Sequence, residues 1–253
     1  MKIFRSESKV DYDTYTFNYA VYCLQEKASE IESIYDNGFL PYSNSTDIKE
    51  NIYYLARSLR VNLDQFQPTS ENRRITRKMA EISPDFRVIE KNNFIKNEDF
   101  NRFCLDYASI RFDGKMPQER FDYIYAWTAF NYIFQFETNG KILGYVFAVI
   151  SEKTLHYWFS FYDLNYSRQG LGKWMMFSVI QWAQENSFEK VYLGTCYGEK
   201  AMYKMRDFKG LAFYDGNAWN PDMKLLKSKC KSDAEFMADD FKINSKNFLN
   251  NIK

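Results

Sequence analysis

The chain has 253 residues, of which 45% are hydrophobic and 19% aromatic, enough for one large domain or two small ones. The net charge of +1, from 34 basic and 33 acidic residues, excludes a generally basic nucleic-acid-binding protein and leaves any such site to a local patch. Four separated cysteines and one histidine make a structural zinc site or a disulfide framework improbable. We expect a cytoplasmic protein, because the sequence has no apolar run of signal-peptide or membrane-spanning length.

The N-terminal region is predicted to contain one helix and one strand. Apolar residues recur every three or four positions over residues 16–36, which favours a helix that Asp36-Asn37-Gly38 would end. Residues 52–63 are apolar and aromatic, which favours a strand. Arg57 and Arg60 stand three apart in it, so we expect them on opposite faces, with only one reaching a site.

A basic helix is predicted to follow Pro68-Thr69-Ser70. Four of its side chains share one face: Arg73, Arg74, Arg77 and Lys78. Like charges at this spacing repel one another by a few tenths of a kcal/mol. The face therefore either meets an anion or is simply solvated.

The middle of the chain is predicted to turn from helices to strands. After a short strand over 86–90, helical spacing runs over 97–111 and again over 117–127. Strands are expected over 132–136, 142–150 and 154–162. Asn139-Gly140 joins the first two and is a strong hairpin signal, because a type I′ turn needs positive φ at both positions.

The C-terminal part is predicted to alternate between strands and helices. A helix from Gly170 to about 186 precedes a buried-type strand over 190–195, a loop with a short helix over 197–206 and a last strand over 211–214. Ser232-Asp233-Ala234-Glu235 has the pattern of a capping box that opens a terminal helix. We expect residues 244–253 to fray.

The stretch from Trp158 to Trp174 contains the clearest candidate site. An aromatic strand ends at Asp163, a polar loop follows, and Gly170 and Gly172 open a helix. Backbone N–H groups at such a helix start suit phosphate or another anion. The alternative is an ordinary corner at which glycines ease packing. An antiparallel meander followed by a strand–helix–strand crossover predicts a mixed sheet, as in the GNAT-type acyltransferase fold.

Two segments of the sequence resemble one family. The first runs Ala56-Arg57-Ser58-Leu59-Arg60-Val61-Asn62-Leu63, then Phe66, Pro68 and Ser70-Glu71-Asn72-Arg73-Arg74. The second contains in order Asp99 to Tyr107, Gly144, Phe161-Tyr162-Asp163, Leu171-Gly172, Tyr192-Leu193-Gly194, Met202, Phe208 and Gly216-Asn217-Ala218-Trp219. Over about residues 38–222, this ordered set resembles the arginyl/leucyl-tRNA–protein transferase family.

The resemblance implies an α+β, GNAT-like fold: a mixed sheet flanked by helices, with a smaller Arg-containing N-terminal subdomain. It implies an enzyme that adds Arg or Leu from charged tRNA to the N-terminal α-amine of acceptor proteins, which marks them for degradation. Charged tRNA and the acceptor protein are then the partners, with no cofactor. The implied division is an N-terminal segment (1–95), a GNAT-like catalytic domain (96–225) and a C-terminal helical tail (226–253).

The sequence departs from the family pattern in three places. The N-terminal cysteine cluster is missing, since Ala56 stands where a cysteine is often found, so no metal is expected. Met202-Tyr203-Lys204 is one residue tighter than the family's Met-x-Tyr-Lys. Ser167 stands where an acetyl-CoA-binding GNAT usually has Gln or Arg.

Transfer of an aminoacyl ester to an α-amine needs alignment and a stabilised oxyanion, but no covalent intermediate. Asp163 is the first candidate to hold the acceptor ammonium and take its proton, although it could be a turn residue or cap. Tyr162, Tyr197 and Glu199 are second candidates, with core or surface roles as the alternative.

Basic residues are assigned to the two substrates. An arginine that makes two hydrogen bonds suits the side-chain carboxylate of an acidic acceptor. We expect Arg57 or Arg60 to bind this carboxylate. For tRNA phosphates we expect a larger set: Arg73, Arg74, Arg77, Lys78, Arg168 and Lys173, with the backbone of Gly170 and Gly172. Two alternatives stay open: an N-acyltransferase that uses acetyl-CoA, and a non-catalytic relative that binds tRNA or peptide N-termini.

Overall fold

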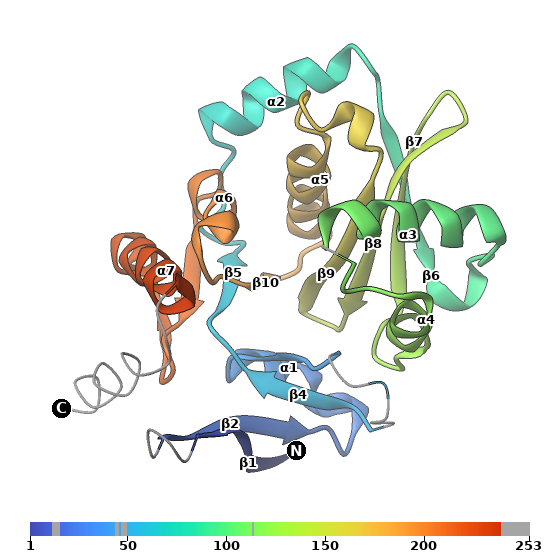
Figure 1. Cartoon of the computed structure of the whole chain (residues 1–253). Coiled ribbons are helices and arrows are strands. Elements are labelled where there is room, and N and C mark those ends of the chain that lie inside the picture. The colour runs from blue at the N-terminus through green and yellow to red at the C-terminus, as the bar shows by residue number, and fades with distance from the viewer. Residues whose placement is uncertain (12–15, 44–45, 47–49, 113, 239–253) are drawn as a thin grey trace.

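The computed structural model describes the chain except residues 12–15, 44–45, 47–49, 113 and 239–253, so the expected fraying of residues 244–253 lies outside the described residues. The described strands form two sheets (Figure 1). The smaller has the order β1-β2-β4-β3, with the bounds β1 (Lys2–Asp11), β2 (Thr16–Leu24), β3 (Phe39–Pro41) and β4 (Ile52–Leu55).

The larger sheet is mixed, as the sequence predicts. Its order is β12-β11-β5-β10-β9-β8-β7-β6, and β9 and β10 are parallel while the other described neighbours are antiparallel. The bounds are β5 (Ser58–Asn62), β6 (Asp85–Glu90), β7 (Tyr132–Thr138), β8 (Lys141–Ile150), β9 (Thr154–Tyr162), β10 (Lys190–Thr195), β11 (Leu211–Tyr214) and β12 (Trp219–Asn220). Asn139 (φ 47°) and Gly140 (φ 76°) join β7 to β8, which confirms the predicted hairpin.

Helices cover both faces of the larger sheet. Successive side chains of a strand point to opposite faces, so neighbouring residues of one strand belong to different cores. Phe134, Phe136 and Val146 pack in the core formed with helix α5 (Leu171–Glu185) and helix α2 (Ser70–Ala80). Their neighbours Ile133, Tyr145 and Phe147 pack in a second core with helices α3 (Glu98–Arg111) and α4 (Gln118–Ala126). Figure 1 shows α3 and α5 beside β8 and β9. The expected sheet flanked by helices is confirmed.

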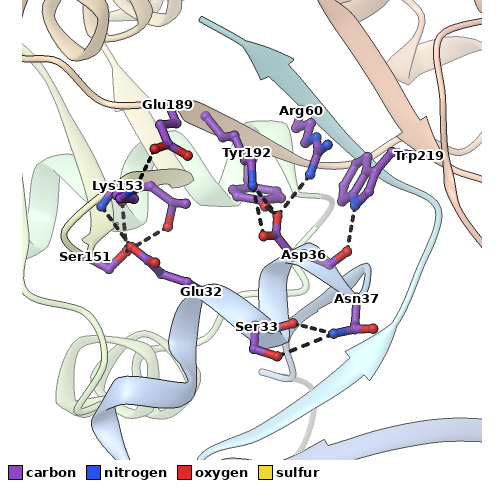
Figure 2. A network of polar contacts seen from close by, with 12 residues as sticks. Glu32, Ser33, Asp36, Asn37, Arg60, Ser151, Lys153, Glu189, Tyr192 and Trp219 are labelled. Carbon is purple, nitrogen blue, oxygen red and sulfur yellow. Dashed lines mark hydrogen bonds and ion pairs between the residues drawn. The ribbon is translucent and has the colours of Figure 1, made fainter.

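The smaller sheet is tied to the larger one through helix α1 (Ile31–Asp36). The Asp36 carboxylate accepts hydrogen bonds from Arg60 at 3.0 Å, from the Tyr192 hydroxyl at 2.7 Å and from Lys190 at 2.8 Å. Its backbone carbonyl accepts one from Trp219 Nε1 at 2.7 Å (Figure 2). Three strands of the larger sheet, β5, β10 and β12, therefore meet the end of α1 at Asp36.

Short helical turns complete the chain: η1 (Ala28–Glu30), η2 (Lys91–Asn93), η3 (Leu164–Tyr166), η4 (Glu199–Ala201) and α6 (Tyr203–Arg206). The predicted helix over residues 16–36 is wrong in its first part, because Thr16–Leu24 is β2, which pairs with β1 and β4. Only the end of that range is helical, and it stops at Asp36 as predicted.

Two further predictions are corrected. The single strand expected over 52–63 is two strands in different sheets, since the chain leaves β4 at Leu55 and enters β5 at Ser58. The capping box at Ser232-Asp233-Ala234-Glu235 lies inside helix α7 (Met223–Ala238). Asp222 caps that helix instead, because its Oδ1 accepts from the backbone N–H groups of Lys224 at 2.9 Å and Leu225 at 3.0 Å.

Candidate active site

The loop between β9 and α5 ends in an uncapped helix start. Gly170 has φ 93°, a left-handed conformation that favours glycine, and it has no side chain with which to cap α5. The N–H of Trp174 donates to the Gly170 carbonyl at 3.0 Å, so the helical ladder begins there. The N–H groups of residues 171–173 have no acceptor within the helix, as at any helix start. They form a place where an anion can bind.

Gly172 allows a close approach between α5 and β9. A Cβ atom added at this position would lie 2.6 Å from Cε1 and 2.9 Å from Cζ of Tyr162. The Tyr162 ring also packs against Tyr107 of α3, with ring centroids 4.9 Å apart. Tyr162 is therefore confined between the first turn of α5 and helix α3.

A cavity of about 630 Å³ opens beside this helix start. Five basic residues line it: Arg74, Arg111, Arg168, Lys173 and Lys200. Apolar and aromatic side chains form other parts of the lining: Ile75, Tyr107, Phe112, Tyr162, Met176 and Tyr203. The cavity thus combines cations, free backbone donors and apolar surface, which suits a ligand with phosphate and apolar parts.

Two of the five cations are held by carboxylates. Arg74 donates to both oxygens of Glu71, at 2.7 Å each, and this pairing lowers the pKa of Glu71. Lys173 lies 2.7 Å from Asp207 and 3.8 Å from Glu71. Glu71 is the one carboxylate among the described residues that line the cavity. The lining as a whole has an excess of positive charge.

Of the residues predicted from sequence, the cavity brings together Tyr162, Arg74, Arg168, Gly170, Gly172 and Lys173. Asp163 lies at a neighbouring cavity, which shares Tyr107 and Tyr162 with the first. Its carboxylate pairs with Lys141 at 2.7 Å and accepts from the backbone N–H of Asn165 at 3.0 Å. These contacts outweigh desolvation and lower the pKa of Asp163, so its ionised form is a weak base.

Arg57 and Tyr197 lie together outside the cavity. Arg57 makes a bidentate pair with Asp233 of α7, at 2.7 and 3.1 Å, and both side chains are largely buried. Its backbone N–H donates to the Tyr197 hydroxyl at 2.8 Å, and its guanidinium lies 4.5 Å from that ring. Asp233 also accepts from the Gly198 N–H at 2.8 Å, so this cluster anchors the segment that carries Lys200.

The remaining predicted cations are also placed outside the cavity. Arg60 pairs with Asp36 at 3.0 Å and stacks on Trp219 at 4.1 Å, at the junction of the two sheets. Arg73, Arg77 and Lys78 are exposed on α2, which continues from Arg74 at the cavity. Contact of these side chains with a substrate stays a prediction.

Sequence reasoning missed several lining residues. Tyr107 and Arg111 stand four apart on α3 and share a face, a spacing that could have indicated them. Ser160 and Lys200 line the cavity without any such signal.

The chain also contains a buried histidine and a half-buried lysine near the point where β10 leaves β9. The two strands pair only over Lys190–Tyr192 and Thr154–His156. Beyond that point, Lys204 Nζ donates to the carbonyls of Leu193 at 2.8 Å and Thr195 at 3.1 Å. Desolvation lowers the pKa of Lys204 to about 8, and burial lowers the pKa of His156 to about 3.

In the described part of the chain, the His, Cys, Asp and Glu side chains form no group of three or more that could hold a metal ion. Cys196 and Cys230 are buried free thiols with sulfur atoms 3.7 Å apart. None of the helices described is both long and apolar enough to span a membrane.

Comparison with known proteins adds a family match and named relatives. Residues 132–205 match the acetyltransferase (GNAT) domain family. The aspartate/glutamate leucyltransferase of Xylella fastidiosa (strain M23) is 33% identical over 87 residues, which is 33% of this chain and 34% of that protein. The enzyme of the same name from Saccharophagus degradans is 24% identical over 168 residues, or 64% of this chain and 69% of that protein. The chain thus aligns with about a third of the length of the first relative.

Solved structures of similar shape are more distant. L-PGS from Bacillus licheniformis has a TM-score of 0.47 at 14% identity, over 84% of this chain and 73% of that one. An aminoglycoside acetyltransferase from an uncultured soil metagenomic sample has a TM-score of 0.35 at 19% identity, over 50% of this chain and 85% of that one. The sheet order, the matched domain and the named relatives confirm the fold and the resemblance expected from sequence. Residues 132–205 thus match a GNAT domain, and the chain is similar to proteins named aspartate/glutamate leucyltransferase.

Proposed function

We propose that this protein is a cytoplasmic aminoacyl-tRNA–protein transferase. It moves a leucyl group from charged tRNA to the N-terminal α-amine of a protein that begins with an acidic residue, and the product is marked for degradation. The observation that carries this proposal is the single cavity in which an uncapped helix start and five basic side chains meet apolar surface. The names of the relatives, which mention a leucyl group and aspartate or glutamate, support this choice of transferred group and acceptor.

The charges of the cavity favour a leucyl over an arginyl group. An arginyl side chain would need a free carboxylate, and Glu71 is the one carboxylate in the described lining. Arg74 occupies both of its oxygens. Ile75, Met176 and Phe112 offer apolar surface that suits a leucyl side chain.

The chemistry needs no covalent intermediate on the protein. The acceptor nitrogen attacks the ester carbonyl, the bond to the tRNA ribose oxygen breaks, and the proton that the nitrogen loses ends on that oxygen as a hydroxyl. An α-amine has an ordinary pKa of about 7.7–8.0, so much of it is already neutral near pH 8. The N–H groups at the start of α5 supply donors of the kind that stabilises an oxyanion. Alignment of the amine with the ester carbonyl in the cavity then accounts for much of the rate enhancement.

The outer face of α2 extends the basic surface away from the cavity. Arg73, Arg77 and Lys78 are exposed there, and they continue from Arg74 in the lining. Phosphate contacts of this kind position a nucleic acid without selecting its sequence. We assign this face to the stem of the tRNA that lies next to the aminoacylated end.

The test compares donors. Purified protein is incubated with labelled leucyl-tRNA, arginyl-tRNA or acetyl-CoA and a peptide that begins with Asp, and the product is identified by mass spectrometry. We expect transfer from leucyl-tRNA. The matched domain is described as an acetyltransferase, so acetyl transfer with none from either charged tRNA would establish the CoA-dependent alternative. Binding of tRNA without turnover from any donor would establish a non-catalytic relative.

A further inference from the structure

An acidic acceptor needs a cation for its side-chain carboxylate. The two arginines that the sequence offered for this task are both engaged elsewhere: Arg57 by Asp233 and Arg60 by Asp36. Neither lines the cavity. Within the cavity, Arg74 and Lys173 are held by Glu71 and Asp207.

Three cations of the lining remain: Arg111, Arg168 and Lys200. None of them forms an ion pair with another described residue. Arg168 lies in the loop that leads to the start of α5 and belongs to the cations that we assign to tRNA phosphates. Lys200 is a point charge, whereas a guanidinium can bind a carboxylate through two parallel hydrogen bonds. Arg111 is therefore the cation whose chemistry and position both suit a carboxylate.

Arg111 stands on a different wall from the anion-binding groups. It is the last residue of α3, whereas the donor groups belong to α2 and α5. Tyr107 packs on Tyr162, and Phe112 packs on Phe161 with ring centroids 6.4 Å apart. These ring contacts fix the end of α3 to the end of β9, so Arg111 is presented from a rigid element.

We propose that Arg111 determines acceptor specificity by binding the side-chain carboxylate of the acceptor's first residue. This inference rests on the proposed function. The acceptor would enter along α3 and place its α-amine beside Tyr162, facing a donor held by α2 and α5. Transfer then requires both substrates to occupy one cavity from different walls.

The experiment measures peptide binding and transfer separately. Peptides that begin with Asp, Asn or Lys are titrated by fluorescence anisotropy into wild type, Arg111→Glu and Arg111→Lys, and the same peptides are then used as acceptors with leucyl-tRNA. The matched control is Arg102→Glu on the same helix, because Arg102 is 68% exposed and lies outside the cavity. Circular dichroism checks that each variant is folded.

Wild type should bind the Asp peptide about 10- to 100-fold more tightly than the Asn peptide, as expected for a charge-assisted pair. Arg111→Glu should invert the preference toward the Lys peptide without changing the KM for leucyl-tRNA, while Arg102→Glu should behave as wild type. Arg111→Lys should keep the acidic preference in weaker form.

The inference is overturned if Arg111→Glu weakens all peptides equally, raises the KM for leucyl-tRNA instead, or changes nothing. Failure of the proposed function gives a different result. Binding would still depend on the first residue and on Arg111, but no donor would give a transferred product.

Discussion

The substitution Gly172→Ala tests whether the cavity beside α5 is an active site. Gly172 lies in the first turn of α5 and has an ordinary helical backbone, so alanine would favour the helix by about 1 kcal/mol. The added Cβ atom would nevertheless lie 2.6 Å from Cε1 of Tyr162. The substitution therefore distinguishes a loss of activity, caused by displacement of Tyr162, from a loss of stability of the fold.

The displacement of Tyr162 can be estimated from the contact. The ring must retreat by roughly 0.8 Å to bring this 2.6 Å contact to 3.4 Å, where ordinary van der Waals contact begins. Tyr107 packs on the same ring, with centroids already 4.9 Å apart, so a displacement of Tyr162 disturbs this contact. Overpacking of this kind costs about 1–3 kcal/mol, which the helix preference of alanine partly offsets. A misplacement of about 1 Å among reacting groups can lower the rate by about 100-fold.

We expect Gly172→Ala to lower kcat/KM for leucyl transfer by about 10- to 100-fold. The loss of stability should stay below about 2 kcal/mol, or a few degrees in Tm. Transfer kinetics and calorimetry measure the two quantities. The control is Gly140→Ala in the β7–β8 hairpin, where φ is 76° and no atom lies within 4 Å of the added Cβ. It should cost about 1–2 kcal/mol of stability through backbone strain and leave kcat/KM unchanged.

An active Gly172→Ala variant, with kcat/KM within about twofold of wild type, would refute the reasoning, because Tyr162 could then move without consequence for the reaction. Loss of activity accompanied by unfolding would also contradict it, since the contact would then belong to the fold and not to the site.

Three further outcomes are expected. Burial lowers the pKa of His156 to about 3, so the stability that its neutral form contributes is present above pH 6.5 and is lost as the pH falls toward 3. NMR of this single histidine should show no titration between pH 8 and 5. A midpoint near 6.5 in the folded chain would contradict the structure. Asp233→Ala leaves Arg57 largely buried without its anion and should cost roughly 3 kcal/mol in urea unfolding, whereas a change below about 0.5 kcal/mol would show that the pair is solvated. Arg168→Ala should reduce the slope of log K against log[salt] for tRNA by about 1, and an unchanged slope would exclude a phosphate contact.

The parts of the fold that could be predicted from sequence have local causes. Asn139-Gly140 specifies its hairpin through its own backbone preferences, and β9 and β10 have the bounds that their apolar runs predict. Thr16–Leu24 is different, because its apolar spacing fits a helix while its pairing with β1 and β4 makes it a strand. Strands that are distant in the sequence therefore determine the secondary structure of that segment.

The same contrast applies to the candidate site. The glycines before and within α5 could be found because a helix start has a local sequence pattern. The ion pairs of Arg57 and Arg60 could not be predicted, because Asp233 lies 176 residues from Arg57 and Asp36 lies 24 residues from Arg60. An arginine chosen for its charge is available to a substrate only if no distant carboxylate already binds it.

The position of β5 has a consequence for how the chain is made. This strand, from the first quarter of the sequence, pairs with β10 on one side and with β11 on the other. During synthesis, residues 58–62 must wait until residues 190–195 and 211–214 have left the ribosome before the centre of the sheet can close. Such long-range pairing folds slowly and leaves strand edges open to aggregation. A fragment that began at residue 96 would expose the edges of both β10 and β11, so the chain should be expressed whole.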